Sequence, residues 1–457
     1  LMVQKIKKIH FIGIGGIGMS SLAEFLNNKF IVSGSDIIKS KKISYLKKIG
    51  IKIFNNHSRN NINSQDLVIY SSAINASNEE YKEAKSRKIK LLSRGEALGK
   101  FTSKYKNICI AGTHGKSTTS SFVSQLLINS GCDITAFLGA IDKKIKSNFI
   151  LGKSKVAVIE ADESDNSFNF IKPKLSIITN IDFDHMDFHK SKKNLFESFK
   201  MFYKNTTDKV VLNFDCMNIK KIFSNIKSKK MIRFGLENQK FEYYFKIKNT
   251  NKVELFHNNK NLLEFKADLS GKHNYYNLIA AIILCLEHGI SKKRIVNSLN
   301  CIERPKRRYE KVYNSRTFEI IDDYAHHPNE IRAIREYIEN NSKKHINYLV
   351  FQPHRHSRVK DNYKEFIDEI SLWDNVIMTD VYSAFENKAR KISLKKFIYD
   401  VLKIKKTNIK YFDSFDTIVN KLYKIKSKDC KIRVITAGAG DVNRIAFMLK
   451  KKLRSNK

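Results

Sequence analysis

Short apolar strands alternate with amphipathic helical segments along the whole chain, and this alternation is the strongest constraint on its fold. Parallel strands need a crossover, usually a helix, to return the chain to the same edge of the sheet. The pattern therefore predicts an α/β protein built on parallel sheets, with irregular β structure at Glu237–Phe265. The strand candidates are Lys8–Ile12, Phe30–Ser33, Asp66–Tyr70, Asn107–Ala111, Val156–Ile159, Leu175–Thr179, Lys209–Asn213, Phe318–Ile321, Tyr348–Phe351, Val376–Thr379 and Arg433–Thr436.

The length of the chain, 457 residues, is too great for a single hydrophobic core. Two seams in the pattern, at Gly99–Lys106 and near Glu303–Arg308, predict three domains. We expect a Rossmann-like N-terminal domain (residues 1–105), a central domain with a P-loop ATPase-like parallel sheet (106–304) and a Rossmann-like C-terminal domain (305–457).

The formal net charge is +40, from 85 Lys and Arg against 45 Asp and Glu. The lysines occur in short pairs such as Lys41-Lys42, and no RNA-binding aromatic motif accompanies them, so we expect no specific nucleic-acid partner. Charge alone would suggest a basic nucleic-acid-associated ATPase. The 6 cysteines form no C-x-x-C pair, which indicates reduced thiols and a cytoplasmic protein. No apolar run is long enough to span a membrane.

A glycine motif follows the first strand candidate. It comprises Gly13, Gly15, Gly16 and Gly18, and Asp36 ends the second strand region. Glycine amides and a helix N-terminus in this order bind a diphosphate, and an acid at this distance commonly contacts a ribose. Taken alone, the motif predicts a NAD-dependent oxidoreductase.

A second loop, ICIAGTHGKSTT, changes that interpretation. It resembles a phosphate-binding loop, although Ile110 stands where the usual pattern has a glycine. A lysine at a helix start can reach the terminal phosphates, and the following hydroxyl can ligate magnesium. The sequence therefore predicts ATP binding. The residues assigned to it are Gly112, Thr113, His114, Gly115, Lys116, Ser117 and Thr118.

Two acidic clusters follow neighbouring strand candidates. The first contains Glu160, Asp162 and Glu163, and the second is the segment from Asp182 to His189. Carboxylates beside a phosphate loop typically hold Mg²⁺. The spacing His185-x-x-x-His189 leaves a zinc site as the alternative.

Seven motifs in a fixed order carry a family resemblance: AGTHGKSTT, EADESD, TNIDFDHMD, GKHNYYNLIAA, DDYAHHP, FQPHRHSR and DVYSAFE. Between about Ile9 and Gly440 the chain resembles the Mur ligases of peptidoglycan synthesis. The resemblance implies an N-terminal domain for a UDP-sugar, a central domain for ATP and a C-terminal domain for an amino acid. The expected reaction joins L-alanine to the lactyl carboxylate of UDP-N-acetylmuramate through an acyl phosphate.

The resemblance also implies roles for particular residues in the first two domains. Ser117 and Glu160 would ligate one magnesium ion, and His185 would ligate a second. His273, Asn274 and Asn277 would border the adenine. The UDP-sugar would contact the glycine motif together with Asp36, Ser71 and Ser72.

In the C-terminal domain, Arg355 or Arg358 would hold the α-carboxylate of alanine, because arginine binds carboxylates bidentately, or would stabilise the charge of the intermediate. A histidine, His327 or His354, would accept the ammonium proton. Tyr324 is assigned to substrate binding, and Arg308 resembles the family arginine that reaches the ATP phosphates. Asp441 departs from the small hydroxyl residue that is commoner in the family.

Two alternatives accompany this expectation. Within the family, a recycling ligase joins a ready-made tripeptide to the same UDP-sugar, but the motifs GIGGIGMSSLA and EADESD favour the alanine-adding member. Outside it, the NAD-dependent oxidoreductase explains the first glycine motif alone. We expect a monomer or weak homodimer with small-molecule substrates.

Overall fold

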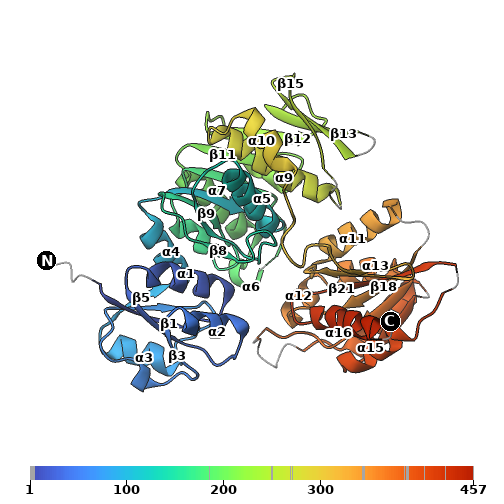
Figure 1. The fold of residues 1–457 in the computed structure, drawn as a ribbon, viewed down its shortest axis with the longest axis horizontal. Coiled ribbons are helices and arrows are strands. Elements are labelled where there is room, and N and C mark those ends of the chain that lie inside the picture. The colour runs from blue at the N-terminus through green and yellow to red at the C-terminus, as the bar shows by residue number, and fades with distance from the viewer. Residues whose placement is uncertain are drawn as a thin grey trace. The chain divides into compact units, whose positions relative to one another are not determined.

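The computed structural model describes residues 6–184, 186–248, 251–267, 269, 271–341, 345–384, 386, 391–405, 407–427 and 429–455. The chain forms two compact units: unit 1 comprises Leu1–Ala267 and Tyr276–Pro305, and unit 2 comprises Asp268–Tyr275 and Lys306–Lys457. Figure 1 colours the chain from the blue N-terminal sheet through the green central sheet to the orange and red C-terminal sheet.

The first sheet of unit 1 is parallel throughout, in the order β3-β2-β1-β4-β5. Its strands are short buried runs, and Ile9, Phe11 and Ile12 of the central strand are fully buried. Its elements are β1 (Lys8–Ile12), α1 (Ile17–Asn27), β2 (Ile31–Ser35), α2 (Lys41–Lys48), β3 (Lys52–Phe54), η1 (Arg59–Asn61), β4 (Leu67–Tyr70), α3 (Glu79–Ser86), β5 (Lys90–Ser93) and α4 (Arg94–Thr102).

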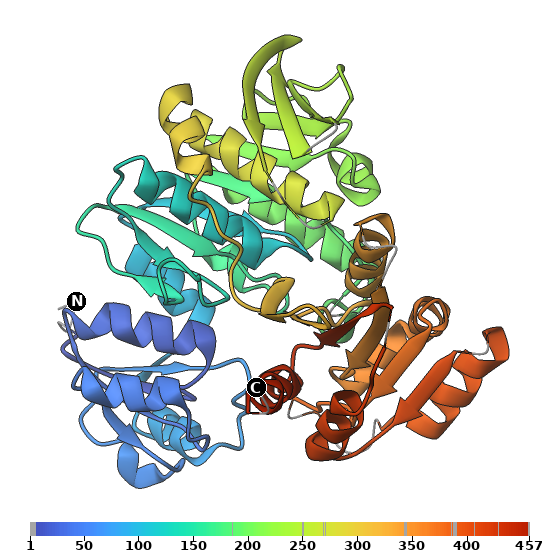
Figure 2. The same cartoon turned by 45° about the vertical axis from the view of Figure 1, so that its right-hand side comes forward.

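The second sheet of unit 1 has the order β15-β14-β13-β12-β11-β10-β6-β9-β7-β8. It is mostly parallel, and an antiparallel extension, β13–β15, lies in lime green at the top of Figure 2. Its strands are β6 (Lys106–Ala111), β7 (Thr135–Phe137), β8 (Phe149–Ile150), β9 (Val156–Glu160), β10 (Leu175–Ile178), β11 (Lys209–Asn213), β12 (Met231–Leu236), β13 (Tyr243–Lys248), β14 (Lys252–His257) and β15 (Lys260–Lys266). Its helices are α5 (Lys116–Asn129), η2 (Ser167–Phe170), α6 (Met186–His189), α7 (Lys192–Asn205), α8 (Met217–Phe223), α9 (Lys272–Glu287) and α10 (Lys292–Leu299), of which α9 begins in unit 2.

A continuous apolar core joins the two sheets of unit 1. Phe25 of α1 packs edge-on against Phe137 of the second sheet, with ring centroids 5.3 Å apart. Helix α4 also lies directly against η2, because Gly95 and Gly99 leave no side chain between them. The glycine motif and the phosphate loop therefore belong to one packed body.

The sheet of unit 2 has the order β16-β17-β21-β18-β19-β20 and is parallel except for the β16–β17 pair. Its strands are β16 (Glu310–Asn314), β17 (Phe318–Asp323), β18 (His345–Phe351), β19 (Asn375–Met378), β20 (Asn408–Tyr411) and β21 (Lys431–Ala437). Its helices are α11 (Pro328–Asn341), α12 (His356–Asp361), α13 (Tyr363–Ser371), α14 (Leu394–Ile404), α15 (Phe415–Tyr423) and α16 (Asn443–Arg454).

The α/β class predicted from the sequence is confirmed, and each strand candidate overlaps a strand, with bounds that differ by up to three residues. The segment Glu237–Phe265 is more regular than expected: β13–β15 form an antiparallel ladder with one register shift between Leu255 and Phe256. Within the described part of the chain, no helix has the length and apolarity needed to cross a membrane.

Candidate active site

The phosphate loop connects β6 to α5 and requires glycine at two positions. Gly112 (φ 133°) and Gly115 (φ 82°) have left-handed backbone conformations. A Cβ atom would lie 2.1 Å from Thr179 Oγ1 at the first position and 2.5 Å from Asn277 Oδ1 at the second. No side chain caps the N-terminus of α5, so its amides point toward the loop and suit an anion.

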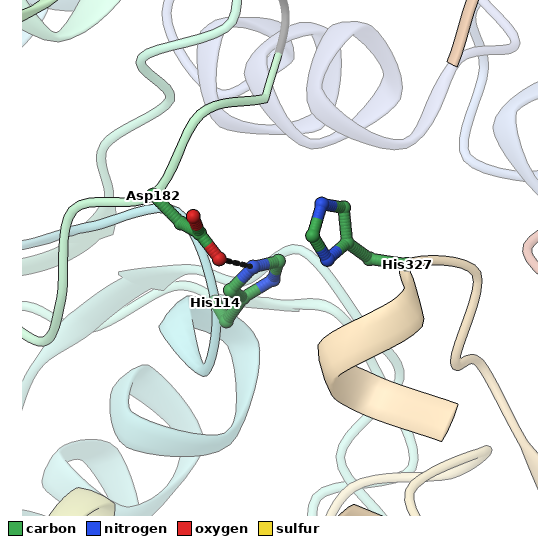
Figure 3. A group of neighbouring side chains, drawn as sticks. All are labelled: His114, Asp182 and His327. Carbon is green, nitrogen blue, oxygen red and sulfur yellow. Dashed lines mark ion pairs between the residues drawn. The ribbon is translucent and has the colours of Figure 1, made fainter. Parts of the chain in front are cut away.

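Asn180 holds this loop and was missed by the sequence reasoning. Its Oδ1 accepts a hydrogen bond from the His114 amide (2.9 Å), and its Nδ2 donates to the His114 carbonyl (2.9 Å). The Asp182 amide donates to Thr113 Oγ1 (2.9 Å), and the Asp182 carboxylate lies 3.4 Å from the His114 ring (Figure 3). The motif TNIDFDHMD was the available signal, because it places these residues after the neighbouring strand β10.

Lys116 is largely enclosed by the loop and an acidic partner. Its Nζ donates to the carbonyls of Gly112 (2.7 Å) and Thr113 (3.1 Å) and lies 2.8 Å from Glu163 Oε2. Burial alone would lower the pKa of Lys116, but the carboxylates around it, led by Glu163, raise it above the usual value. The Lys116 side chain therefore stays positively charged and is held in place at the N-terminus of α5.

Ser117 and Glu160, the two expected magnesium ligands, are neighbours. Ser117 Oγ donates to Glu160 Oε1 (3.0 Å), and the Gly139 amide donates to Glu160 Oε2 (2.7 Å). These are hard oxygen donors, the chemistry that Mg²⁺ prefers. The next predicted ATP-binding residue, Thr118, is almost fully buried.

The second acidic segment is described only in part. His185, predicted to be a ligand of a second magnesium ion, lies outside the described residues. The ring of His189 bonds through Nε2 to the carbonyl of Glu163 (3.0 Å), which indicates a structural role and gives no support to the zinc alternative.

The glycine motif faces a cavity of about 290 Å³ that extends to Glu160, the carboxylate that accepts from Ser117 of the phosphate loop. One wall carries the predicted substrate residues Gly16, Gly18, Ser71 and Ser72, and the other carries Glu160. A group bound at the glycine motif would thus approach the carboxylate that contacts Ser117. The complete lining is Gly16, Ile17, Gly18, Met19, Ser21, Ser71, Ser72, Arg94, Leu98, Phe137, Leu138, Gly139, Glu160 and Asp162.

Asp36 contacts the glycine motif directly. Its Oδ2 accepts from the Gly15 amide (2.8 Å), and its Oδ1 accepts from the Ile38 amide (2.9 Å). Gly13 has a left-handed backbone (φ 78°), and a Cβ there would lie 3.2 Å from the Ser71 Cβ. Asp36 thus shapes the loop, and its contact with a ribose or uracil stays a prediction.

Arg94 was not singled out from the sequence, although it is the cation in the cavity lining. Its Nη2 donates to Ser167 Oγ (3.0 Å) and lies 3.7 Å from Asp165 and 3.8 Å from Asp162. These contacts link the first helix after β5 to the acidic loop after β9, which no local motif reveals.

Of the three residues expected to border the adenine, Asn277 lies against the phosphate loop at Gly115. His273 and Asn274 belong to unit 2, where the Asn274 amide donates to the Gly271 carbonyl (3.1 Å). Their contact with adenine stays a prediction.

In unit 2, the predicted histidine and arginine residues gather after β17 and β18. Arg358 Nη1 lies 2.9 Å from His354 Nδ1, and the His354 and His326 rings are 5.6 Å apart. His327 is buried at the start of α11, and the Asn329 amide donates to its Nδ1 (3.4 Å).

Arg355 precedes α12 with a left-handed backbone (φ 66°), and its Nε donates to Glu386 Oε1 (3.1 Å). Glu386 also accepts from the His356 amide (2.5 Å), so it orients the predicted alanine-binding segment. Its place in the motif DVYSAFE was the only sequence signal. Tyr324 lies beneath the guanidinium groups of Arg307 and Arg308, each 5.1 Å from the ring centre.

Three family models match successive parts of the chain. The model described as "Mur ligase family, catalytic domain" matches residues 8–106, and "Mur ligase middle domain" matches residues 110–285. "Mur ligase, glutamate ligase domain" matches residues 307–440.

Relatives and solved structures agree with these matches. The UDP-N-acetylmuramate–L-alanine ligase of Brachyspira hyodysenteriae is 36% identical over 100% of both chains, and that of Fusobacterium nucleatum is 35% identical over 99% of this chain and 98% of its own. The crystal structure of the Thermotoga maritima UDP-N-acetylmuramate–alanine ligase superposes with a TM-score of 0.80 at 28% identity, covering 99% of this chain and 100% of that one. Neither the oxidoreductase nor the tripeptide ligase alternative is favoured by these comparisons.

Proposed function

The chain belongs to the Mur ligase family, and from this premise we propose that it joins L-alanine to the lactyl carboxylate of UDP-N-acetylmuramate with ATP, releasing ADP and phosphate. The observation that carries the proposal is the position of Glu160. It bonds to Ser117 of the phosphate loop and also lines the cavity of the glycine motif. A carboxylate substrate held at that motif would be directed toward the terminal phosphate of ATP.

The glycine motif binds the diphosphate of the UDP-sugar through its amides and the N-terminus of α1, which has no side-chain cap. The lactyl carboxylate attacks the γ-phosphorus of ATP, so that the bond to ADP breaks and an acyl phosphate forms. Lys116 neutralises charge on the phosphates, and Arg308 has the role of the family arginine that binds them. Without this neutralisation, the lactyl carboxylate and the γ-phosphate, which are both anions, would repel each other.

Ser117 and Glu160 fit a magnesium ion, and His185 is the proposed ligand of a second. Bound Mg²⁺ supplies charge neutralisation at the phosphate oxygens. The residues of this chain hold the reactants in place around it.

The amine of alanine then attacks the acyl carbon, phosphate leaves and an amide remains. Arg355 or Arg358 holds the alanine carboxylate, and Tyr324 lies beside this site. His327 or His354 accepts the ammonium proton before attack, because only the neutral amine is a nucleophile.

We also propose that the enzyme acts in the cytoplasm as a monomer or weak homodimer. The three domains would be bounded at residues 105 and 305, close to the limits of the matched family models.

Phosphate release from ATP, Mg²⁺ and UDP-N-acetylmuramate tests the proposal, with L-alanine, with tripeptide and with no acceptor. We expect release to require L-alanine. Lys116→Ala should abolish turnover while the UDP-sugar still binds, whereas Lys153→Ala, at an exposed lysine, should leave both unchanged. Phosphate release that does not depend on L-alanine would refute the proposal. Turnover by the Lys116→Ala variant would also refute it.

A further inference from the structure

Arg308 lies in a turn whose backbone is held in a sparsely populated conformation. The residues on either side, Arg307 (φ 59°) and Tyr309 (φ 51°), are both in the left-handed region, which bulky residues rarely adopt. Such strain persists only where surrounding contacts over-determine it, and it clusters at functional sites. The contacts that hold this turn therefore set the position of Arg308.

Arg307 supplies the largest share of these contacts. Its Nε donates to Asp322 Oδ2 (3.1 Å), its Nη1 to the Gly440 carbonyl (3.0 Å) and its Nη2 to the Gly438 carbonyl (2.6 Å). Three directed bonds from one planar group fix both the turn and the loop after β21. A lysine at this position would keep the charge but could not reproduce that geometry.

Two neighbouring carboxylates at the end of β17 provide the remaining contacts that hold the turn 307–309. Asp322 is fully buried and also accepts from Thr436 Oγ1 (2.7 Å), so removing Arg307 would leave a buried charge without its counter-ion. Asp323 accepts from the amides of Tyr309 (2.6 Å) and Ala325 (2.7 Å). The backbone on both sides of Arg308 is thus anchored.

The Arg308 side chain itself is only lightly engaged. Its guanidinium lies over the Tyr324 ring and attracts the Asp323 carboxylate through space, while among the residues that the structure describes it forms no hydrogen bond or close ion pair. The turn and the Tyr324 ring therefore orient the N–H donors of Arg308 but accept no hydrogen bond from them. Donors in this state suit a group that binds an anion.

We propose that Arg307 is a positioning residue for ligation: it holds the turn 307–309 so that Arg308 presents its guanidinium to the phosphates of ATP. This inference rests on the proposed function, in which Arg308 contacts those phosphates. It adds a residue that acts on the reaction through its neighbour.

Arg307→Lys is the informative variant, because the positive charge beside Asp322 is kept. We expect kcat to fall roughly ten- to hundred-fold and the KM for ATP to rise, with the KM for L-alanine nearly unchanged and a cooperative thermal unfolding transition retained above the assay temperature. Arg316→Ala is the matched control, since Arg316 is an exposed arginine between β16 and β17. It should keep wild-type kinetics.

A double-mutant cycle with Arg308→Ala separates positioning from a general structural role. If Arg307 acts through Arg308, Arg307→Lys will change kcat less than about two-fold in the Arg308→Ala background. An equal loss in both backgrounds, or a wild-type kcat in Arg307→Lys, would overturn the inference.

The same measurements distinguish this failure from that of the proposed function. Unchanged kinetics in Arg308→Ala would remove Arg308 from the phosphate site and the inference with it. Absence of L-alanine-dependent phosphate release in the wild-type chain would refute the proposed function itself.

Discussion

Glu80, on α3, is fully buried beneath the first sheet, yet four polar side chains converge on it. Ser35, His57 and Asn61 bond to its carboxylate, and His10 Nε2 lies 3.5 Å away. Burial by itself would raise the pKa of Glu80, but these hydrogen bonds lower it to about 2. The folded state therefore stabilises the charged form of Glu80 over the protonated form.

This residue predicts an acid-dependent loss of stability. The pKa of Glu80 falls from 4.5 in the unfolded chain to about 2 in the folded protein. Its contribution to the free energy of unfolding is therefore complete above pH 4.5 and is lost as the pH falls toward 2. A shift of this size corresponds to about 3 kcal/mol. In urea unfolding, the deficit of Glu80→Gln relative to wild type should shrink by about this amount between pH 5 and pH 2.

Glu79→Gln is the control for this measurement, since Glu79 is exposed on the same helix turn. It should show no deficit that varies with pH. A deficit for Glu80→Gln that stays constant over the whole range would show that Glu80 acts by shape alone.

Among elements, the contact of α4 with η2 depends on two glycines one helical turn apart. A Cβ at Gly95 would lie 2.5 Å from the Ser167 Cβ, and one at Gly99 would lie 2.1 Å from the Phe170 carbonyl oxygen. Glycine inside a helix ordinarily costs about 1 kcal/mol relative to alanine. Here it allows two backbones to touch.

Gly99→Ala should therefore destabilise the protein in spite of its better helix propensity. We expect the free energy of unfolding to fall by roughly 1–3 kcal/mol, because the helix must move away from η2. Lys100→Ala, at the exposed neighbouring position, should change it by less than about 0.5 kcal/mol. Stabilisation by Gly99→Ala in chemical denaturation would contradict this packing.

The longer strands could be predicted because their apolar runs are local signals, as at Lys209–Asn213, where the expected and observed bounds agree. The strands β7 and β8, of 3 and 2 residues, are too short to show periodicity. The extension β13–β15 was expected as irregular β structure from the alternation in KFEYYFKI and VELF, whereas its antiparallel pairing and the register shift at Leu255 depend on partner strands that the sequence does not show.

The candidate site likewise contains residues that local motifs reveal and residues that such motifs do not reveal. Lys116 and Ser117 could be predicted because a phosphate loop is a motif of consecutive residues. Glu163, Asn180 and Arg94 were not given their roles, because their partners lie 47, 66 and 73 positions away. Such pairings arise from the order of strands in the sheet, which local patterns do not encode.

For the whole molecule, the net charge of +40 sets up a positive field around the enzyme. ATP and the UDP-sugar are anions, whereas L-alanine carries no net charge. A field of this sign raises the association rate of anions and is screened by salt.

We therefore expect kcat/KM for ATP and for UDP-N-acetylmuramate to fall several-fold between about 20 mM and 300 mM ionic strength. The KM for L-alanine should hardly change. Initial rates measured with one substrate varied at a time provide the test, and an equal response of all three substrates would show that salt acts on the fold instead.

The pairing of Lys116 with Glu163 has a consequence for how nucleotide is taken up under the proposed function. A cation that already has an internal counter-ion, 2.8 Å away, does not simply gain a phosphate; it exchanges one anion for another. The internal carboxylate thus competes with the nucleotide for the same charge, so the apparent affinity reports the difference between two pairings. Such an arrangement keeps the charge of the enclosed Lys116 side chain paired when no nucleotide occupies the loop.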